Sequence, residues 1–529
     1  MADEALDHAD DIHGAFGTIS RHDVGAQRSW RARLLTLAAI IGPGLIVMVA
    51  DNDAGGVATY SAAAQNYGLT LLWTLPLLIP VLIVNQEMVV RLGAVTGVGH
   101  AKLIAERFGR FWAAFSVGDL FVLNFLTIVT EFIGVNLALG YFGVSPYISV
   151  PIAAVALVAL TTSGSFRRWE RFMFVFVFAN LLIIPLAIYS HPRGSDVAYH
   201  FVVPGVQGGF NSTAVLLIIA IVGTTVAPWQ LFFQQSNIVD KKITTKWVNY
   251  ERADTVIGSF VAVILASLIL VTVATVFTGT PLAGHFTNAA GVAHGLAHYL
   301  GRGAGAMYSI ILLNASIIGA ASVTLSTTYA FGDIFGSTHS LNRSFREAKF
   351  FYASYAALVV LAGAIVLIPN APLGLITTAV QALAGILLPS ATVFLLLLCN
   401  DKAVLGPWVN RPWLNIVAGL IVSTLFVLSL ILMVTTVFPK IDVVTLLLAL
   451  GGAMLAAFAV VVVVYFFFLA GREGEPAMST ERRANWRMPP VALLTPPRPS
   501  RIRSMTLGVM WGYLAVSAVC LLIKAIQIG

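Results

Sequence analysis

The sequence predicts an all-α polytopic membrane protein, on the strength of its composition and of repeated apolar runs. Hydrophobic residues make up 58% of the 529 positions, and charged residues only 10%. A soluble domain of this size does not tolerate that balance. About thirteen apolar runs approach or exceed the ~20 residues that a helix needs to cross a bilayer. They cover residues 34–62, 69–93, 112–142, 145–163, 170–190, 212–238, 253–278, 305–333, 349–368, 372–398, 412–437, 441–469 and 506–527.

Basic residues gather on alternate sides of the predicted spans. Arg31 and Arg33 precede the first span, Lys102 and Arg107 follow the second, and an Arg-rich segment precedes the last. Because loops rich in Lys and Arg stay in the cytoplasm, we expect a cytoplasmic N-terminus and insertion in a bacterial-type inner (plasma) membrane. The net charge of +7 is therefore a topology signal. We expect no nucleic-acid partner, since the basic loops lack stacking aromatic residues.

Two of the apolar runs are interrupted midway. The first contains Asp-Asn-Asp-Ala-Gly-Gly at 51–56, and the sixth contains a Pro-Trp-Gln sequence at 228–230, where the proline removes a backbone donor. Ordinary Gly and Pro kinks are the simpler explanation. However, paired interruptions in the first and sixth spans occupy matching positions of two inverted repeats of five spans, which is typical of a transporter's binding site.

The first interruption carries two carboxylates at bilayer depth, where charged groups are expensive and are retained for function. Unwinding would allow Asp51 and Asp53 to reach one cavity together with Asn52. It would also free carbonyl groups near Ala50 and Thr224, at the negative ends of the two half-helices. An environment made only of oxygen ligands is the type that hard divalent cations prefer.

In both interruptions the chain resembles the Nramp divalent-metal transporters. The similarity rests on Gly42-Pro43-Gly44, Asp53 to Thr59, Tyr67-Gly68, Leu72-Trp73, Gly223, Thr225, Val226, Pro228 and Leu231, with weaker likeness at 130–134 and 381–389. It covers roughly residues 35–400. The resemblance implies a LeuT-type inverted repeat of five plus five transmembrane helices with broken helices 1 and 6, followed here by extra C-terminal helices.

The departures from the family pattern concern the metal ligands. The resemblance implies that Asp53 keeps the coordinating aspartate, whereas Gly56 and Ala227 replace a coordinating asparagine and methionine. Losing the thioether removes a soft ligand that favours manganese and iron over magnesium. The smaller side chains leave room for Mg²⁺, which usually retains several waters, and Asp51 and Asn52 could contact those waters. The pattern resembles Nramp-related magnesium transporters, so we expect Mg²⁺ as substrate and Mn²⁺ also to be accepted.

A second departure concerns proton coupling. Proton-coupled members carry an aspartate three residues before the third-span glutamate and a histidine after the sixth-span proline. Those positions are Ile128 and Trp229 here, and neither side chain exchanges a proton, although Glu131 remains as a coupling candidate or a structural partner. The resemblance therefore implies alternating access that is uncoupled from protons and driven by the membrane potential. The alternative is a proton-coupled Mn²⁺/Fe²⁺ importer.

Other polar residues are weaker site candidates. Gln381 aligns with a glutamine that can face the family's site, and Trp229 and Gln230 would shape the wall beside Ala227. Glu87 in the second span is a candidate gate or helix-packing residue. Asp254, near the start of the seventh span, is expected in a capping or snorkelling role.

These observations divide the chain into five expected parts. They also predict that the protein is not an enzyme. The expected parts are a disordered cytosolic tail (1–33), a ten-helix transport core (34–398, with repeats 34–190 and 212–398), additional transmembrane helices (399–469), an Arg-rich cytosolic loop (470–505) and a final transmembrane helix (506–529). A His-Glu-x-x-His motif and a phosphate-binding Gly-rich loop are both missing. We expect no cofactor. The expected partners are the ion and the lipid bilayer, and the oligomeric state stays open.

Overall fold

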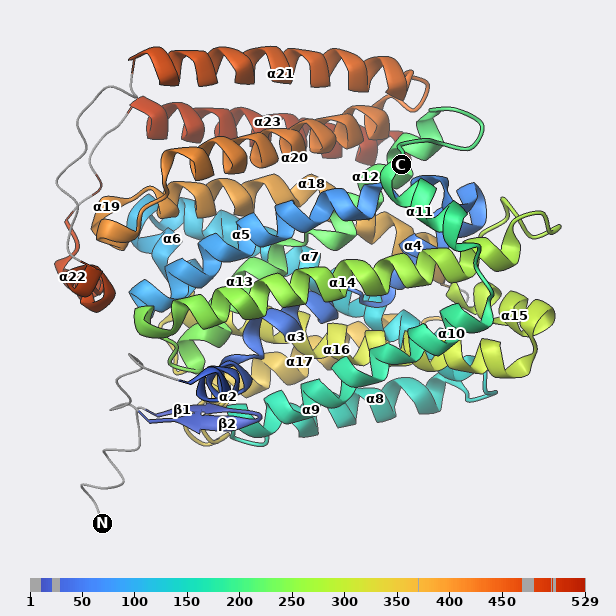
Figure 1. Cartoon of the computed structure of the whole chain (residues 1–529), viewed down its shortest axis with the longest axis horizontal. Helices are drawn as coiled ribbons and strands as arrows, with labels where there is room; N and C mark the ends of the chain where they lie inside the picture. The colour runs from blue at the N-terminus through green and yellow to red at the C-terminus, as the bar shows by residue number, and fades with distance from the viewer. Residues whose placement is uncertain are drawn as a thin grey trace.

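The computed structural model describes residues 11–20, 29–369, 371–468, 480–495, 497 and 501–528, and these form a bundle of long helices (Figure 1). Among the described helices, nine are long and apolar enough to cross a membrane, or up to eleven if each of two bent pairs counts as one span. The all-α membrane fold is thus confirmed. The described part of the chain thus has fewer full-length spans than the roughly thirteen predicted runs. Some of the runs are divided and others are short, as in the 16-residue helix α8 (Pro146–Thr161).

The two ends of the bundle differ. The end that we call the basic end carries α2 (Trp30–Ile40), α6 (His100–Phe108), α19 (Lys402–Leu405) and α22 (Thr480–Asn485), at the left of Figure 1. The opposite end carries α11 (Gly194–Val202) and α15 (Ala289–Leu300). The other core helices are α5 (Thr74–Thr96), α7 (Arg110–Gly140), α9 (Phe166–Ala179), α10 (Ile183–Tyr189), α14 (Val248–Phe277), α16 (Arg302–Phe335), α17 (Lys349–Val366) and α18 (Leu373–Cys399), with short 3-10 turns η1 (Gly68–Leu71), η2 (Asn180–Leu182), η3 (Thr245–Trp247) and η4 (Gly406–Trp408).

Both predicted interruptions are present. The first span is divided into α3 (Pro43–Ala50) and α4 (Ala54–Tyr67), and the sixth into α12 (Ser212–Thr225) and α13 (Pro228–Asp240). Pro228 begins α13, where its missing N–H is no loss. The two breaks therefore follow from residues that the sequence shows directly, and they place irregular backbone at the middle of the bundle.

The N-terminal residues do not match the expected disordered tail. Strands β1 (Ile12–Gly14) and β2 (Gly17–Ile19) pair as an antiparallel hairpin. This hairpin packs against α2 and α9, and Phe16 lies 4.5 Å from Phe174 between ring centroids. The prediction of disorder for 1–33 is wrong for the hairpin and for α2, because long-range contacts stabilise a segment that reads as polar. Residues 1–10 and 21–28 lie outside the described part.

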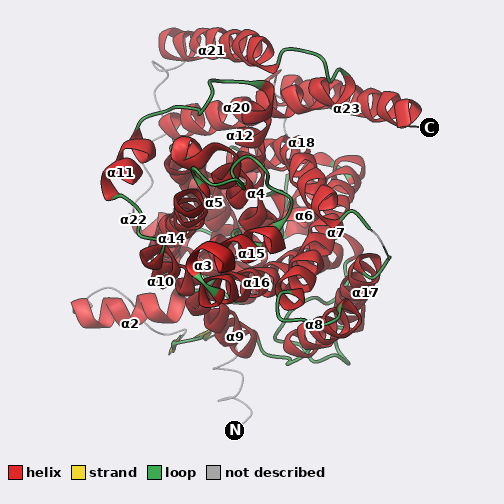
Figure 2. Ribbon diagram, turned by 90° about the vertical axis from the view of Figure 1, so that its right-hand side faces the viewer, coloured by secondary structure: helices red, strands yellow, loops and turns green. Residues whose placement is uncertain are grey.

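Three C-terminal helices form a layer on one side of the core (Figure 2). They are α20 (Pro412–Val437), α21 (Val443–Phe468) and α23 (Arg501–Ile528), and α20 packs on α18. Part of the predicted Arg-rich loop, including η5 (Val491–Leu493), is ordered: Trp408 Nε1 donates to the Arg483 carbonyl at 3.0 Å, and Met488 N donates to the Val95 carbonyl at 3.3 Å. Residues 469–479 of that loop lie outside the described part.

Candidate metal-ion site

The first break joins two helix ends of opposite polarity. Helix α3 ends at the fully buried Ala50, and α4 begins at Ala54 with Asp53 as its N-cap. Asp53 Oδ1 accepts a hydrogen bond from the Gly56 amide at 2.7 Å. The C-terminal end of α3 carries partial negative charge and suits a cation, whereas the N-terminal end of α4 suits a carboxylate. The break can therefore hold a carboxylate and a cation side by side.

Asp51 links the first break to the second. Its carboxylate is 1% exposed, and Oδ1 accepts a hydrogen bond from Gln230 Nε2 of α13. Gln230 in turn accepts from Gln86 Nε2 of α5 at 3.1 Å. This chain of contacts places both broken helices and α5 around one carboxylate. Gln86 was not among the residues that sequence reasoning selected, although it is an amide within an apolar span.

Glu131 of α7 approaches the first break from another side. Its Oε2 accepts from the Ala54 amide at 3.1 Å, so Asp53 and Glu131 both lie at the start of α4. Gly319 of α16 makes this approach possible, since a Cβ there would lie 2.7 Å from Glu131 Oε2 and 2.8 Å from Asp53 Cβ. Gly319 could not be selected from the sequence, because only the packing of α16 against the break gives this glycine a role.

Several buried oxygens around the two breaks have no hydrogen-bond partner among the residues that the structure describes. They are Asp51 Oδ2, Asn52 Oδ1, Gln86 Oε1, Glu131 Oε1 and Thr224 Oγ1. Buried polar atoms are almost always satisfied, and leaving them unpaired costs about 1–3 kcal/mol each. A cation with its water shell would satisfy several of these oxygens at once.

Protein carboxylates alone do not complete a metal site here. Within the described residues, no three His, Cys, Asp or Glu side chains are placed to hold one metal ion together. Asn52 also uses its Nδ2 to donate to the Ala262 carbonyl at 3.0 Å, which holds it against α14. A cation held here would therefore take its remaining ligands from amide, hydroxyl and carbonyl oxygens and from retained waters.

The small residues at the breaks control the space beside the carboxylates. Gln381 of α18 lies against Gly55, where a Cβ would come within 1.7 Å of its Nε2. A Cβ at Gly56 would lie 3.1 Å from the Asp51 carbonyl oxygen. Ala227 is 6% exposed and is the N-cap of α13. Glycine at 55 and 56 therefore allows the Gln381 amide and the Asp51 carbonyl to approach the start of α4 closely.

Two predicted gating candidates have other contacts. Glu87 forms ion pairs with Arg91 at 3.1 Å and Arg252 at 2.6 Å, so its carboxylate belongs to an ion-pair cluster towards the basic end. Trp229 is fully buried and packs on Phe233 with ring centroids 6.1 Å apart. The ion pairs are compatible with either role predicted for Glu87, and Trp229 packs within α13 beside Ala227.

Asp254 holds the start of the first half-helix. Its carboxylate accepts from the amides of Gly42 at 3.0 Å, Gly44 at 2.7 Å and Leu45 at 3.1 Å. A Cβ on Gly44 would lie 2.8 Å from the Thr255 backbone nitrogen, so the close approach requires glycine. The capping role expected for Asp254 is present, but it acts on α3 and not on its own helix.

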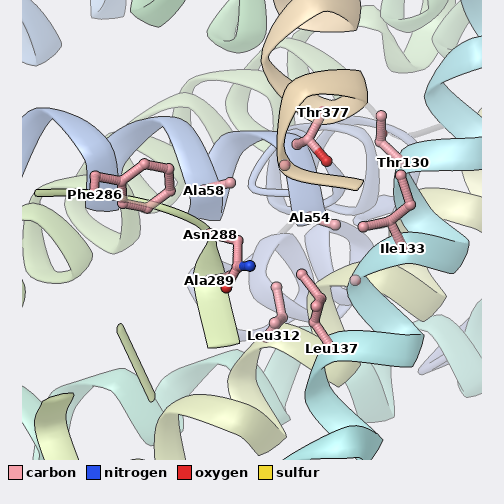
Figure 3. A pocket seen from close by; sticks show the side chains of 12 residues that line it. Ala54, Ala58, Thr130, Ile133, Leu137, Phe286, Asn288, Ala289, Leu312 and Thr377 are labelled. Atoms are coloured by element: carbon pink, nitrogen blue, oxygen red, sulfur yellow. The ribbon is translucent and has the colours of Figure 1, made fainter. Parts of the chain in front are cut away.

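A small cavity adjoins the first break (Figure 3). Its walls include Ala54 at the start of α4, Thr130 beside Glu131, Thr377 of α18 and the segment 286–289 that precedes α15. Because α15 lies at the opposite end of the bundle, this cavity extends from the break in that direction (Figure 1). Asp51 and Asp53 themselves are at most 4% exposed, so the structure is closed around them.

Known proteins match this chain along most of its length. The family model described as natural resistance-associated macrophage protein-like (Nramp) matches residues 44–435. A Staphylococcus aureus (strain Mu3) protein named "Divalent metal cation transporter MntH" is 26% identical over 421 residues, which cover 75% of this chain and 91% of the relative. The protein of the same name from Lacticaseibacillus casei (strain BL23) is 27% identical over 418 residues, covering 76% and 90%.

Solved structures show the same fold. The Eremococcus coleocola manganese transporter, in complex with an aromatic bis-isothiourea substituted compound, superposes with a TM-score of 0.63 at 17% identity, covering 96% of this chain and 99% of the other. MhsT in complex with L-phenylalanine gives a TM-score of 0.50 at 14% identity, covering 76% and 100%. These neighbours support the LeuT-like arrangement with two broken helices. Together with the family match over residues 44–435, they show that the chain belongs to the Nramp family.

Proposed function

We propose that this protein transports divalent cations by alternating access and that it imports Mg²⁺, with Mn²⁺ also accepted, as a partly hydrated ion. The observation that carries the proposal is the set of buried, unpartnered oxygens around Asp51, Asn52 and Thr224. The curated relatives named as divalent metal cation transporters support the cation class. The ion is the substrate of the site and not a resident cofactor.

The preference for Mg²⁺ rests on the chemistry and the space at the two breaks. Every side-chain ligand candidate at the breaks offers oxygen, and Ala227 stands where the family carries a thioether. Soft ligands favour later transition metals, whereas oxygen ligands suit Mg²⁺ and Mn²⁺ alike. Gly55 and Gly56 add no side-chain bulk beside Asp51, Asp53 and Gln381, which supports binding of an ion that keeps part of its water shell. This arrangement supports the proposed likeness to the Nramp-related magnesium transporters.

Transport is proposed to be uncoupled from protons. Ile128 and Trp229 are buried and carry no titratable group at the positions associated with proton movement. The membrane potential supplies ~2.3 kcal/mol per charge per 100 mV, hence about 4.6 kcal/mol for a divalent ion. That drive is sufficient for net import without a second ion.

The direction of import follows from a proposed cytoplasmic basic end and N-terminus. The basic end carries Lys102, Arg107, Arg110, Lys241, Lys242, Arg343 and Arg346, whereas the opposite end carries Arg193, Arg302 and Lys440. Loops rich in Lys and Arg are retained in the cytoplasm. The cavity beside the first break then extends towards the outside of the cell.

The test is Mg²⁺ uptake into proteoliposomes that contain a Mg²⁺-sensitive dye, at a clamped potential and with internal pH followed in parallel. The native chain should admit Mg²⁺ without acidification, and Asp53→Ala should abolish uptake, since it removes both a ligand and the cap of α4. Asp442→Ala is the matched control, because Asp442 is an exposed aspartate between α20 and α21. Uptake that survives in Asp53→Ala would overturn the proposed site.

One observation favours the alternative, a proton-coupled Mn²⁺/Fe²⁺ importer. Glu131 keeps one unpartnered oxygen beside Asp53, which is a suitable place for a proton that moves with the ion. In the same proteoliposomes, this alternative predicts Mn²⁺ uptake with acidification and little Mg²⁺ uptake. A pH gradient that drives uphill accumulation at clamped potential would also decide for coupling.

A further inference from the structure

Helix α2 lies across the direction of the transmembrane helices. Its axis bends by 52° from α3, which follows it directly. In Figure 1 α2 is seen end-on beside spans that run across the view, and in Figure 2 it projects sideways from the bundle. At the basic end, a helix in this orientation lies along the boundary between lipid and water and not through the membrane.

The projecting half of α2 combines apolar and basic side chains. Trp30, Leu34 and Leu35 are 67%, 52% and 71% exposed. Arg31 and Arg33 between them are exposed as well, and the Arg31 guanidinium lies 6.0 Å from the Trp30 ring centroid. Tryptophan and leucine at such a boundary enter the acyl region, while arginine side chains extend to the phosphate level.

Within the part of the chain that the structure describes, no carboxylate forms an ion pair with Arg31 or Arg33. The guanidinium groups are therefore available to bidentate phosphate ligands. Charge complementarity thus selects anionic headgroups over zwitterionic ones for this face.

The other half of α2 is held firmly by the N-terminal hairpin. Gly14 packs so closely on α2 that a Cβ would come within 1.8 Å of the Ala39 carbonyl oxygen. The hairpin is tied to α9 through the Ala15 amide, which donates to Glu170 Oε2 at 2.5 Å, and through Arg171 Nε, which donates to the Ala15 carbonyl at 3.0 Å. Residues 36–40 are thus fixed to the protein, and only residues 30–35 extend into the surroundings.

We propose that α2 binds anionic phospholipids of the cytoplasmic leaflet, with Arg31 and Arg33 on the phosphates and Trp30, Leu34 and Leu35 among the acyl chains. The choice of leaflet rests on the proposed orientation, but the binding itself does not depend on the transported ion. The hairpin fixes residues 36–40, so the lipid contact is confined to residues 30–35.

The test measures how strongly brominated lipids quench the fluorescence of Trp30. The native chain and Trp30→Phe are reconstituted with brominated phosphatidylglycerol or brominated phosphatidylcholine, and the difference in quenched fluorescence between the two proteins isolates Trp30 among the ten tryptophans. Quenching should be stronger with the brominated phosphatidylglycerol in mixed vesicles. The variant Arg31→Gln/Arg33→Gln should lose this preference, by roughly fivefold per arginine, and Arg31→Lys/Arg33→Lys should retain most of it.

The matched control is Arg343→Gln/Arg346→Gln, which removes two exposed charges from a loop at the same end and should leave the preference unchanged. Equal Trp30 quenching by both lipids in the native chain would overturn the proposal. Trp30 fluorescence that neither lipid quenches would also overturn it and would indicate that protein, such as a second copy of this chain, covers α2. This experiment measures fluorescence and not transport. Its result therefore stands even if the proposed Mg²⁺ transport is refuted.

Discussion

Gly319 offers a sharp test of the proposed ion site, because it is remote from the breaks in sequence and touches them in space. Replacing it by alanine places a Cβ 2.8 Å from Asp53 Cβ, 2.7 Å from Glu131 Oε2 and 2.9 Å from Glu131 Cδ. Carbon atoms pack best at ~3.5–4.0 Å, so the contact with Asp53 Cβ is short by about 0.7 Å. Asp53 caps α4 through its side chain and therefore cannot move away without disturbing the break.

The expected loss of stability in Gly319→Ala follows from this overlap. Overpacking costs about 1–3 kcal/mol, and replacing a helical glycine by alanine offsets about 0.8–1.0 kcal/mol of that cost. The variant should therefore fold with a free energy of unfolding at most about 2 kcal/mol lower. If the bound ion fixes Asp53 in its present place, ~1.4 kcal/mol of that strain weakens apparent Mg²⁺ affinity by about tenfold.

The assay is dye-monitored Mg²⁺ uptake as a function of external Mg²⁺, together with thermal unfolding of the purified protein with and without Mg²⁺. Gly303→Ala is the control on the same helix, since a Cβ there meets nothing within 4 Å. It should keep native uptake. Native affinity and rate in Gly319→Ala would refute the reasoning, because the ion could not then depend on the present placement of Asp53 and Glu131.

Three further predictions concern ion selectivity, the stability of α3 and pH. Ala227→Met should raise Mn²⁺ uptake relative to Mg²⁺ by about tenfold in competition assays, because a thioether favours the softer ion; an unchanged ratio would contradict the ligand assignment. Asp254→Asn removes a charged acceptor whose hydrogen bonds are each worth ~1.5–3 kcal/mol, so hydrogen exchange in α3 should accelerate, whereas Asp196→Asn on the exposed α11 should not change it. Burial opposes a charge on His339, but its hydrogen bond to Asp333 and the Asp333 charge raise the His339 pKa above its ordinary value of 6.5. The loop after α16 should therefore be protected from exchange below that value and lose protection as the pH rises through the raised pKa; protection that is flat with pH would exclude this contact.

The sequence by itself determined the class of fold and the position of both breaks. Carboxylates, glycines and a proline within otherwise apolar runs have local consequences that need no tertiary information, so residues 51–56 and 228–230 could be recognised as interruptions. The helices indeed end at Ala50 and Thr225 and begin again at Ala54 and Pro228. The residue types at these breaks also indicated hard oxygen ligands.

Only the tertiary structure decided which groups surround the breaks and which of their oxygens remain unpartnered. Gln86, Gly319 and Asp254 act through contacts between helices far apart in the chain, and apolar periodicity does not encode which faces of such helices meet. The N-terminal hairpin could not be predicted from the sequence for the same reason. Its two short strands have little stability of their own and are held by the backbone of α2 and by Glu170 of α9, and such contacts exist only once the bundle has assembled.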